Sequence, residues 1–272
     1  CKKAINDSVK YANERKQFNV FISSFGSIKH KLAEQVIRTF ALESAIYRLS
    51  KDIDDKIESF KSEGMDKGKA SIEGISHYAV EAAILKVYGS EALDFVIDEA
   101  VQIHGGMGYS AEMAVERGYR DSRINRIFEG TNEINRLLVV DTAMKRAMKG
   151  DFDLFGRATE LLQNLGSAVN SPVEGENFFE AKMRYILNFK NLTLIIMQGA
   201  SQCFGKGLGA EQEVLNNLAD MIMEVYIAES MVLRVQKMDV LGLSIPLHRD
   251  LLDVFVYDAA DHIRKPAADA IN

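Results

Sequence analysis

One glutamate lies where a general base could act on a bound ligand. Glu129 follows Phe128 and precedes Gly130, in an irregular stretch just before a helix predicted to begin at about Asn132. An apolar neighbour disfavours the ionised form of a carboxyl group and so makes it a better proton acceptor. Gly130 lets a ligand come close, and the free N–H groups of a helix start follow it. The spacing alone also fits a surface glutamate beside a helix cap.

Two other places carry side chains suited to a phosphate-containing ligand. The guanidinium of Arg15 can hold two phosphate oxygens at once. Gln102 is followed by the glycine-rich stretch His104–Gly108, where the missing side chain of Gly106 lets the backbone approach a phosphate. Each place also has a purely structural interpretation: Arg15 belongs to the polar cluster Asn13–Lys16, and the glycines can end a helix.

Helices are expected to position these residues. The chain has 272 residues and only three prolines, and most of its apolar residues recur at intervals of three and four, so we predict an all-α fold. Gly150-Asp151 marks a boundary between a helical bundle over residues 1–149 and a second helical bundle over residues 150–272. The predicted helices cover residues 1–15, from Ser27 to a turn at Gly64–Gly68, 69–103, 111–120, 132–149, 152–167, 176–203, 208–240 and 249–271.

Details of these helices follow from residue types. Ser27 and Thr131 are predicted to cap the second and the fifth of them. The helix over residues 176–203 is rich in aromatic and aliphatic residues, so it is expected to lie in the middle of the second bundle. His104 is interpreted as a residue that ends a helix.

Composition excludes several classes of function. The net charge is −6 and no basic block occurs, so nucleic-acid binding is not expected. The two cysteines, Cys1 and Cys203, form neither a disulfide framework nor a metal-binding spacing, which is typical of a reducing compartment. The five histidines lack the Glu-x-x-His spacing of di-iron bundles. The longest apolar run, around Leu192–Met197, is far shorter than a bilayer span.

Three motifs resemble those of the acyl-CoA dehydrogenase family and occur in the family's order. Phe128-Glu-Gly-Thr-Asn-Glu-Ile134 resembles the signature that carries the catalytic glutamate. Glu14-Arg-Lys-Gln-Phe18 resembles the Arg-x-x-Phe flavin motif, and Gln102–Tyr109 resembles the Gln-x-x-Gly-Gly motif. The region 150–272 is similar to the C-terminal extension of the very-long-chain type.

The resemblance implies a FAD-dependent oxidation of fatty acyl-CoA to trans-2-enoyl-CoA, a step of fatty acid β-oxidation. It implies that Glu129 takes the α-proton, that its backbone N–H stabilises the thioester oxygen, and that Phe128 and Gly130 bind substrate. A homodimer and an electron-transfer flavoprotein are the implied partners, and Arg15, Gln17, Gln102 and Gly106 would reach the flavin of the neighbouring subunit. The implied flavin contacts are Arg15, Gln17, Phe18, Phe25, Gly26, Gln102, Gly105, Gly106, Thr131 and Glu133.

The chain is expected to be part of a longer protein. Cys1–Tyr11 has the pattern of the middle of a helix, and the family places an N-terminal helical domain and a middle β-domain ahead of this region. We therefore predict that these residues alone neither hold FAD tightly nor turn over substrate. Two alternatives stay open: an acyl-CoA oxidase, which passes electrons to oxygen, and a helical scaffold that lacks the chemistry.

The sequence also bears on location and surface contacts. A bacterial cytoplasm is favoured over the mitochondrial matrix or the inner-membrane face of a eukaryote. Membrane contact has little support, because no basic amphipathic stripe occurs. Arg120, Arg123 and Arg126 could hold a phosphate of CoA, but a solvated, salt-bridged face is the favoured interpretation.

Overall fold

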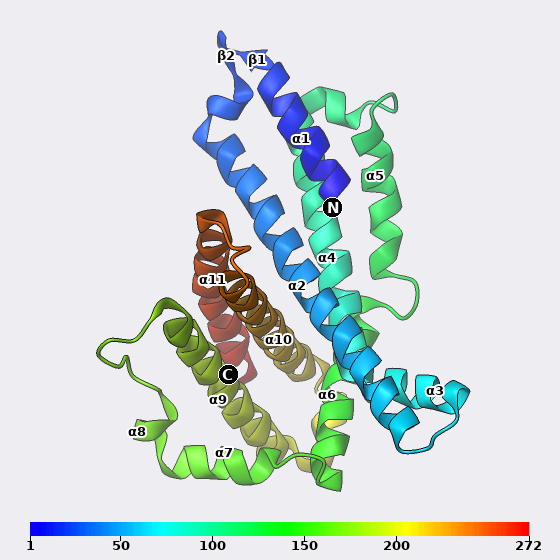
Figure 1. Cartoon of the computed structure of the whole chain (residues 1–272), viewed down its shortest axis with the longest axis vertical. Helices are drawn as coiled ribbons and strands as arrows, with labels where there is room; N and C mark the ends of the chain where they lie inside the picture. The colour runs from blue at the N-terminus through cyan, green and yellow to red at the C-terminus, as the bar shows by residue number, and fades with distance from the viewer. Residues whose placement is uncertain (272) are drawn as a thin grey trace. The chain divides into compact units, whose positions relative to one another are not determined.

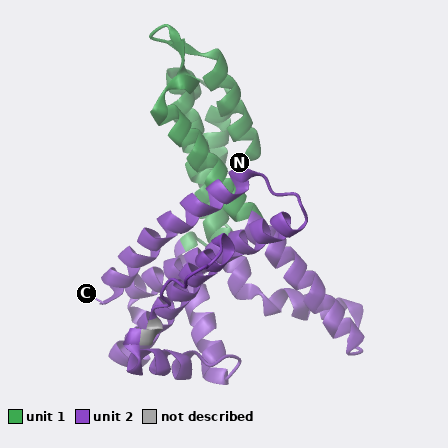
Figure 2. Cartoon of the chain, turned by 60° about the vertical axis from the view of Figure 1, so that its left-hand side comes forward, with its two compact units in different colours: residues 1–43, 86–132 green, residues 44–85, 133–272 purple. Residues whose placement is uncertain are grey.

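The fold is all-α, as predicted. The computed structural model describes residues 1–271, without the side chains of residues 167 and 168. Apart from a hairpin of two-residue strands, its regular elements are α-helices and short 3-10 helices (Figure 1). Contacts divide the chain into unit 1, residues 1–43 and 86–132, and unit 2, residues 44–85 and 133–272 (Figure 2). This division differs from the domain boundary expected at residue 150, which stays a prediction.

Unit 1 is a set of helices around a shared apolar interior. Small and branched apolar residues at helical spacing form this interior, and their removal from water is the main force that holds the helices together. They are Ala4 and Ile5 of α1, Val96, Ile97 and Ala100 of α4, and Val115 of α5. The elements of unit 1 are α1 (Lys2–Glu14), β1 (Lys16–Gln17), β2 (Val20–Phe21), η1 (Ile22–Ser24), the first part of α2 (Gly26–Ser62), the last part of α4 (Ala79–His104), η2 (Gly105–Tyr109), α5 (Ala114–Arg123), η3 (Ile124–Arg126) and the first residue of α6.

A tight hairpin follows α1, in the stretch between the first two predicted helices. β1 and β2 pair in antiparallel register. The two residues between them, Phe18 and Asn19, have φ angles of 51° and 65°. Positive φ at both central residues matches the twist of a two-residue turn between antiparallel strands. Asparagine tolerates this conformation, but a phenylalanine there is not a pattern that sequence reasoning would take for a turn.

The prediction that Ser27 caps the second helix is wrong. α2 begins at Gly26, and the carbonyl of Phe25 accepts the first helical hydrogen bonds, from the N–H groups of Ile28 at 3.1 Å and Lys29 at 3.0 Å. The backbone of Phe25 is extended, with φ −74° and ψ 135°. Phe25 therefore takes the N-cap position without a side-chain acceptor, and Ser27 already lies inside the helix.

Unit 2 is a larger set of helices with α9 at its centre. α9 packs against α7, α10 and α11, which confirms the central place predicted for the aromatic helix. Large side chains from these helices are fully buried, among them Ile186, Leu218, Met231 and Leu252. Besides the remaining parts of α2, α4 and α6, its elements are α3 (Lys67–His77), α7 (Leu154–Gln163), α8 (Leu165–Ala168), α9 (Phe178–Phe204), η4 (Gly205–Ala210), α10 (Gln212–Val240) and α11 (Pro246–Ile271).

The third predicted helix is in fact two helices. α3 ends at His77, and Tyr78, with φ −104° and ψ 30°, breaks the helical path before α4 begins. α3 lies close against α2, because a Cβ placed on Gly74 would be 2.5 Å from Cγ1 of Ile57. Arg146 of α6 donates a hydrogen bond to the carbonyl of His77. These tertiary contacts end α3 at a position where local propensity alone favours continuation.

The boundaries of the next two helices are predicted with different accuracy. The helix predicted over residues 111–120 is α5, which begins later, at Ala114. Turn hydrogen bonds occupy the preceding backbone, from Ser110 N–H to the Met107 carbonyl and from Met113 N–H to the Ser110 carbonyl. The helix predicted over residues 132–149 is confirmed as α6 (Asn132–Lys149).

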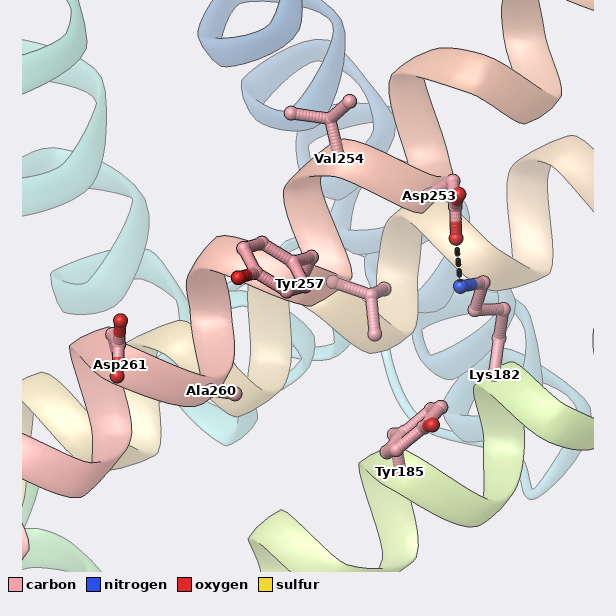
Figure 3. A pocket seen from close by; sticks show the side chains of 8 residues that line it. Lys182, Tyr185, Asp253, Val254, Tyr257, Ala260 and Asp261 are labelled. Atoms are coloured by element: carbon pink, nitrogen blue, oxygen red, sulfur yellow. Dashed lines mark hydrogen bonds and ion pairs between the residues drawn. The ribbon is translucent and has the colours of Figure 1, made fainter. Parts of the chain in front are cut away.

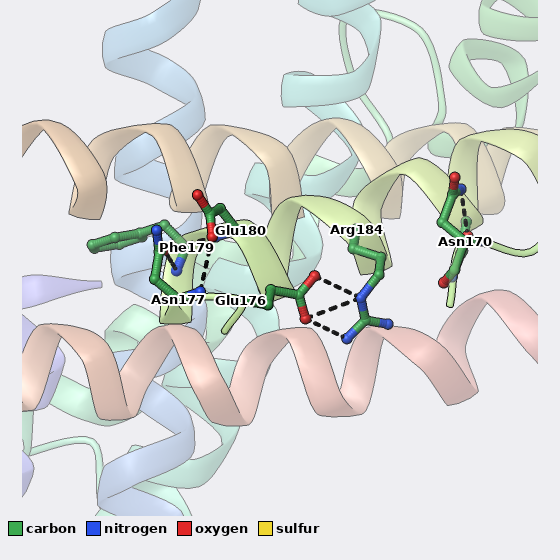
Figure 4. A network of polar contacts seen from close by, with 7 residues as sticks. Asn170, Glu176, Asn177, Phe179, Glu180 and Arg184 are labelled. Carbon is green, nitrogen blue, oxygen red and sulfur yellow. Dashed lines mark hydrogen bonds and ion pairs between the residues drawn. The ribbon is translucent and has the colours of Figure 1, made fainter. Parts of the chain in front are cut away.

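Side-chain contacts hold the start of α9 (Figure 4). Asn177 accepts hydrogen bonds from the backbone N–H groups of Phe179 and Glu180, and the Glu180 carboxylate accepts one from the N–H of Asn177. This reciprocal pair is a capping box. Arg184 donates to both carboxylate oxygens of Glu176, with Nε 2.8 Å from Oε1, and this hydrogen bonding lowers the pKa of Glu176.

A mostly buried carboxylate of α10 lies between two cations. Glu229 accepts a hydrogen bond from Nη1 of Arg48 at 3.0 Å and another from Lys190. Burial by itself would raise the pKa of Glu229, but the hydrogen bond and charge of Lys190, together with Arg48, outweigh it and lower the pKa. This carboxylate has a structural role, since its two oxygens are occupied within unit 2.

Candidate active site

Glu129 has a backbone conformation that L-residues rarely adopt. Its φ is 55°, and the φ of the following Gly130 is 81°. Among residues 1–271 only Phe18 and Asn19, in the hairpin turn, are other non-glycine residues with positive φ. A left-handed residue with a side chain costs roughly 1–2 kcal/mol, so the surrounding structure has to impose it.

The Glu129 side chain is exposed. No hydrogen bond or ion pair to a described residue occupies its carboxylate. The prediction that apolar neighbours shield it is wrong for the described chain, because Ile127 and Phe128 are themselves 47% and 48% exposed. The carboxylate is therefore open to a ligand.

Sequence reasoning missed the residue that ties this loop to α4. Asn132, the first residue of α6, is only 3% exposed. Its Oδ1 accepts a hydrogen bond from Nζ of Lys86 at 2.7 Å, and its Nδ2 donates to Oγ of Ser90 at 2.9 Å and to Oε1 of Glu91 at 3.1 Å. An asparagine at a helix start is ordinarily a cap for that helix, so no sequence signal pointed to this contact.

Five predicted flavin contacts lie around the hairpin at one end of unit 1 (Figure 1). Arg15 directly follows α1 and is exposed, and its guanidinium pairs with no carboxylate in the described chain. Gln17 is exposed in β1. Phe18 is 89% exposed and meets the ring of Phe25 edge-on, with 6.3 Å between the ring centroids. A Cβ on Gly26 would meet nothing within 4 Å.

The glycine-rich motif lies at the same end of unit 1. Ala12, Ile22 and Ile103 share one buried cluster, which joins α1, the hairpin side and the end of α4. The ring of Tyr11 stacks on that of His104, with 4.3 Å between centroids. His104 is buried as the last residue of α4, and its Nδ1 bonds to a carbonyl of that helix. This confirms the interpretation of His104 as a helix-end residue.

The glycines of the motif differ in whether the fold itself requires glycine at their position. Gly105 has a φ of 59°, and a Cβ on Gly108 would lie 2.4 Å from the carbonyl oxygen of Val101. Gly106 has neither constraint: a Cβ there would meet nothing within 4 Å. The side chain of Gln102, on the last turns of α4, is exposed beside it. The fold of the chain explains Gly105 and Gly108, whereas Gly106 leaves room for something outside the chain.

Glu129 and the flavin motifs lie at opposite ends of unit 1. Asn132 bonds to Ser90, and Gln102 lies twelve residues further along α4, an axial distance of about 18 Å at 1.5 Å per residue. The structure therefore brings the two predicted flavin motifs together but does not bring them to Glu129. Thr131 follows Gly130, and Glu133 is exposed in the first turn of α6.

The arginine series before Glu129 is mostly ion-paired within the chain. Arg120 pairs with Glu116 at 2.5 Å, and this hydrogen bond raises the pKa of Arg120. Arg126 pairs with Asp94 of α4 at 3.0 Å. Arg123 is exposed. These pairs favour the structural interpretation of the series over a phosphate site.

A groove in unit 2 carries no comparable set of chemical groups. It measures about 540 Å³, lies between α9 and α11, and its Lys182 is ion-paired with Asp253 (Figure 3). Across residues 1–271, no three His, Cys, Asp or Glu side chains are grouped to hold a metal ion. In the same residues, no helix has the length and apolar character needed to cross a membrane. The lining residues of the groove are Lys182, Tyr185, Asp253, Val254, Val256, Tyr257, Ala260 and Asp261.

Two family models match the chain, and both are described as acyl-CoA dehydrogenase, C-terminal domain: one over residues 1–144 and one over residues 188–272. A probable acyl-CoA dehydrogenase of Bacillus subtilis (strain 168) is 43% identical over 237 residues, which cover 87% of this chain and 40% of that protein. The mitochondrial very long-chain specific acyl-CoA dehydrogenase of Mus musculus is 30% identical over 285 residues, covering 98% and 41%.

A solved structure agrees with these sequence matches. The crystal structure of an acyl-CoA dehydrogenase complexed with FAD from Bacillus anthracis superposes with a TM-score of 0.92 at 39% identity. The superposition covers 99% of this chain and 46% of that one. The chain therefore spans less than half the length of each of these relatives.

Proposed function

The chain belongs to the acyl-CoA dehydrogenase family, and on that premise we propose that the full-length protein oxidises the Cα–Cβ bond of a long-chain fatty acyl-CoA to trans-2-enoyl-CoA, with FAD as oxidant. The observation that carries this proposal is the Glu129 carboxylate. It is exposed, has no partner among the described residues, and stands on a left-handed backbone next to Gly130. A carboxylate kept open at such a backbone cost is suited to act on a ligand.

Two C–H bonds of the substrate break in this reaction. The Glu129 carboxylate accepts the proton from Cα, and the electron pair of that bond becomes the second bond between Cα and Cβ. FAD, when bound, supplies the two-electron oxidant that takes the β-hydrogen as hydride. The backbone N–H of Glu129 is proposed to donate to the thioester oxygen, where negative charge develops. Gly130 leaves room for the thioester, and Phe128 offers apolar surface.

The residues around the hairpin fit the phosphate-bearing part of a dinucleotide. Arg15 offers a guanidinium with no carboxylate partner in the described chain, and Gln17 and Gln102 offer exposed amides. Gly106 leaves an open approach to the backbone. This end of unit 1 lies about 18 Å along α4 from the Glu129 loop. From the resemblance to the family, we infer that it serves the flavin of a neighbouring subunit. Phe18, Phe25 and Gly26 would complete that contact, and Thr131 and Glu133 would contact the other flavin.

The test follows flavin bleaching in the full-length protein. A long-chain acyl-CoA is added anaerobically to wild type, to Glu129→Gln, and to Glu174→Gln as a matched control. Glu174 also precedes a glycine with a φ of 81°. We expect bleaching of wild type and Glu174→Gln at equal rates, and a rate lower by about 10²–10⁴-fold in Glu129→Gln. Equal bleaching in all three proteins would place the base elsewhere.

The same experiment separates the competing activities. Absence of bleaching in all three proteins, with flavin bound, would support a scaffold without the chemistry. Rapid reoxidation of the reduced, product-bound flavin by oxygen would make the protein an acyl-CoA oxidase. Slow reaction with oxygen and fast reoxidation by an electron-transfer flavoprotein is the outcome that we expect.

A further inference from the structure

We propose that Asn132 is a positioning residue for Glu129, acting through a polar stripe on α4 that fixes the loop on both sides of the base. This inference rests on the proposed function, because it assigns a role in the same reaction. Asn132 touches neither substrate nor cofactor in this assignment. It acts by keeping the Glu129 carboxylate in one place.

The backbone of Glu129 needs such a constraint. Its φ of 55° would relax toward ordinary values in a free loop, since the left-handed conformation is unfavourable for a residue with a side chain. In the hairpin, strand pairing imposes positive φ on Phe18 and Asn19. The Glu129 loop has no strand pairing. Besides local backbone hydrogen bonds to the Ile124 carbonyl, side-chain contacts to α4 hold it on both sides of Glu129.

The contact that follows Glu129 in the chain is made by the buried side-chain amide of Asn132, whose two N–H donors and whose oxygen all have hydrogen-bond partners. Nδ2 of Asn132 donates one hydrogen to Ser90 Oγ and the other to Glu91 Oε1, and Oδ1 accepts from Nζ of Lys86. The Ser90 hydroxyl donates in turn to the Val87 carbonyl at 2.9 Å. At 3% exposure, water cannot replace these partners without opening the structure. The side-chain amide therefore holds the backbone at residue 132 against α4.

The upstream contact lies on the same face of α4. Arg126 pairs with Asp94 at 3.0 Å. Lys86, Ser90 and Asp94 are spaced four residues apart, so they form one stripe along the helix. Glu129 is three residues after Arg126 and three residues before Asn132. The stripe thus contacts the loop at Arg126 and at Asn132, each three residues from Glu129. The segment between these two contacts is short, so its backbone has few alternative conformations.

The test compares two kinds of buried amide in the full-length holoenzyme. Asn132→Asp keeps the shape and the acceptor for Lys86 but loses both donors and sets a carboxylate against Glu91. The control is Gln35→Ala: Gln35 is fully buried and donates to the Val96 carbonyl of the same helix at 2.7 Å, away from the stripe. Ser90→Ala serves as a second, milder variant if Asn132→Asp does not fold.

We expect Asn132→Asp to lower kcat by about 10²-fold, the typical effect of misplacing a group by about 1 Å. KM for acyl-CoA and flavin content should stay near wild type. The deuterium isotope effect with α-deuterated substrate should rise, because proton abstraction becomes more strongly rate-limiting. Gln35→Ala should lose stability with an unchanged isotope effect.

Two outcomes would overturn the proposal. One is a folded, flavin-loaded Asn132→Asp or Ser90→Ala with wild-type kcat and isotope effect. The other is the same loss of kcat in Gln35→Ala, which would show a general effect of buried amides. In both cases, slow flavin reduction in Glu129→Gln would mean that only the positioning role of Asn132 fails and that the proposed reaction stands. Flavin reduction at the wild-type rate in Glu129→Gln would mean that Glu129 is not the base, so the proposed function would fail too.

Discussion

The same four-residue pattern, Glu-Gly-x-Asn, begins two long helices of this chain and serves opposite purposes. Residues 129–132 end with the first residue of α6, and residues 174–177 directly precede α9. In both, the glycine has a φ of 81°. The two glycines therefore share a left-handed backbone, but Glu129 also has a positive φ of 55°, which Glu174 does not have. The two loops differ as well in what their polar side chains contact.

The asparagines show this difference most clearly. Asn177 accepts from backbone N–H groups of its own helix and is exposed, which is ordinary capping. Asn132 is buried and reaches another helix, α4. The first arrangement stabilises a helix start, whereas the second fixes a loop in space. Local sequence cannot distinguish them, because the partner that decides the outcome is more than forty residues away, at Ser90.

The carboxylates of the two regions also differ in their contacts: two of those near α9 are paired within the fold, and Glu129 is not paired with any described residue. Around α9 and α10, Glu176 bonds to Arg184, and Glu229 lies between Arg48 and Lys190. In the loop before α6, no partner in the described chain occupies the Glu129 carboxylate. Paired carboxylates stabilise a fold, and an open one at a strained backbone is available for chemistry.

Alanine at each of the two matched glycines gives the largest expected difference. Gly130→Ala and Gly175→Ala each place a side chain at φ 81°, so each should cost roughly 1–2 kcal/mol in the free energy of unfolding. Only Gly130→Ala should also slow anaerobic flavin reduction, by about 10²-fold, because the base moves. Urea unfolding and stopped-flow absorbance measure the two effects. Slow flavin reduction in Gly175→Ala would contradict the assignment of the reaction to the Glu129 loop alone.

Glu229→Gln tests the claim that carboxylates in unit 2 are structural. The lowered pKa of Glu229 means that its charge stabilises the fold above its unfolded pKa, near 4.3, and that this stabilisation is lost as pH falls through the lower, folded value. At pH 7 the substitution should cost about 2 kcal/mol, less than breaking a fully buried pair. The cost should shrink as the pH falls below about 4, where the wild-type carboxylate also loses its charge.

The measurement is the free energy of unfolding between pH 7 and pH 3. Wild type should lose stability toward low pH more steeply than Glu229→Gln, and flavin reduction at pH 7 should be unchanged by the substitution. Some acid sensitivity should remain in the variant, because Arg184 also lowers the pKa of Glu176. Parallel pH curves for the two proteins would contradict a stabilising role of the Glu229 charge.

Much of the fold and part of the site can be predicted from sequence. Apolar periodicity locates α1, α6 and α9 to within a few residues, because these helices bury one continuous face. It misses the break at Tyr78, since contacts of α3 with α2 and α6 decide it. Glu129 is found through a motif, but its left-handed backbone and the role of Asn132 depend on contacts between distant parts of the chain.

The smallest expected loss of stability is that of Asn177→Ala, and it is best compared with the loss in Asn132→Ala. Asn177→Ala should cost about 1 kcal/mol, the usual value for a lost cap. Asn132→Ala should cost about 2–3 kcal/mol, because Lys86, Ser90 and Glu91 each lose a hydrogen bond to a buried side chain. Amide hydrogen exchange localises the loss of stability in Asn177→Ala. The N–H groups of Phe179 and Glu180, which donate hydrogen bonds to Asn177 in wild type, should exchange faster in this variant.

Flavin reduction completes this last comparison. Asn177→Ala should reduce its flavin at the wild-type rate, because the start of α9 holds no group of the reaction. Asn132→Ala should be slow as well as less stable. Equal stability losses in the two variants would mean that the contact with α4 contributes no more than an ordinary cap. The constraint on Glu129 would then have to come from other contacts of the loop, among them the pair of Arg126 and Asp94.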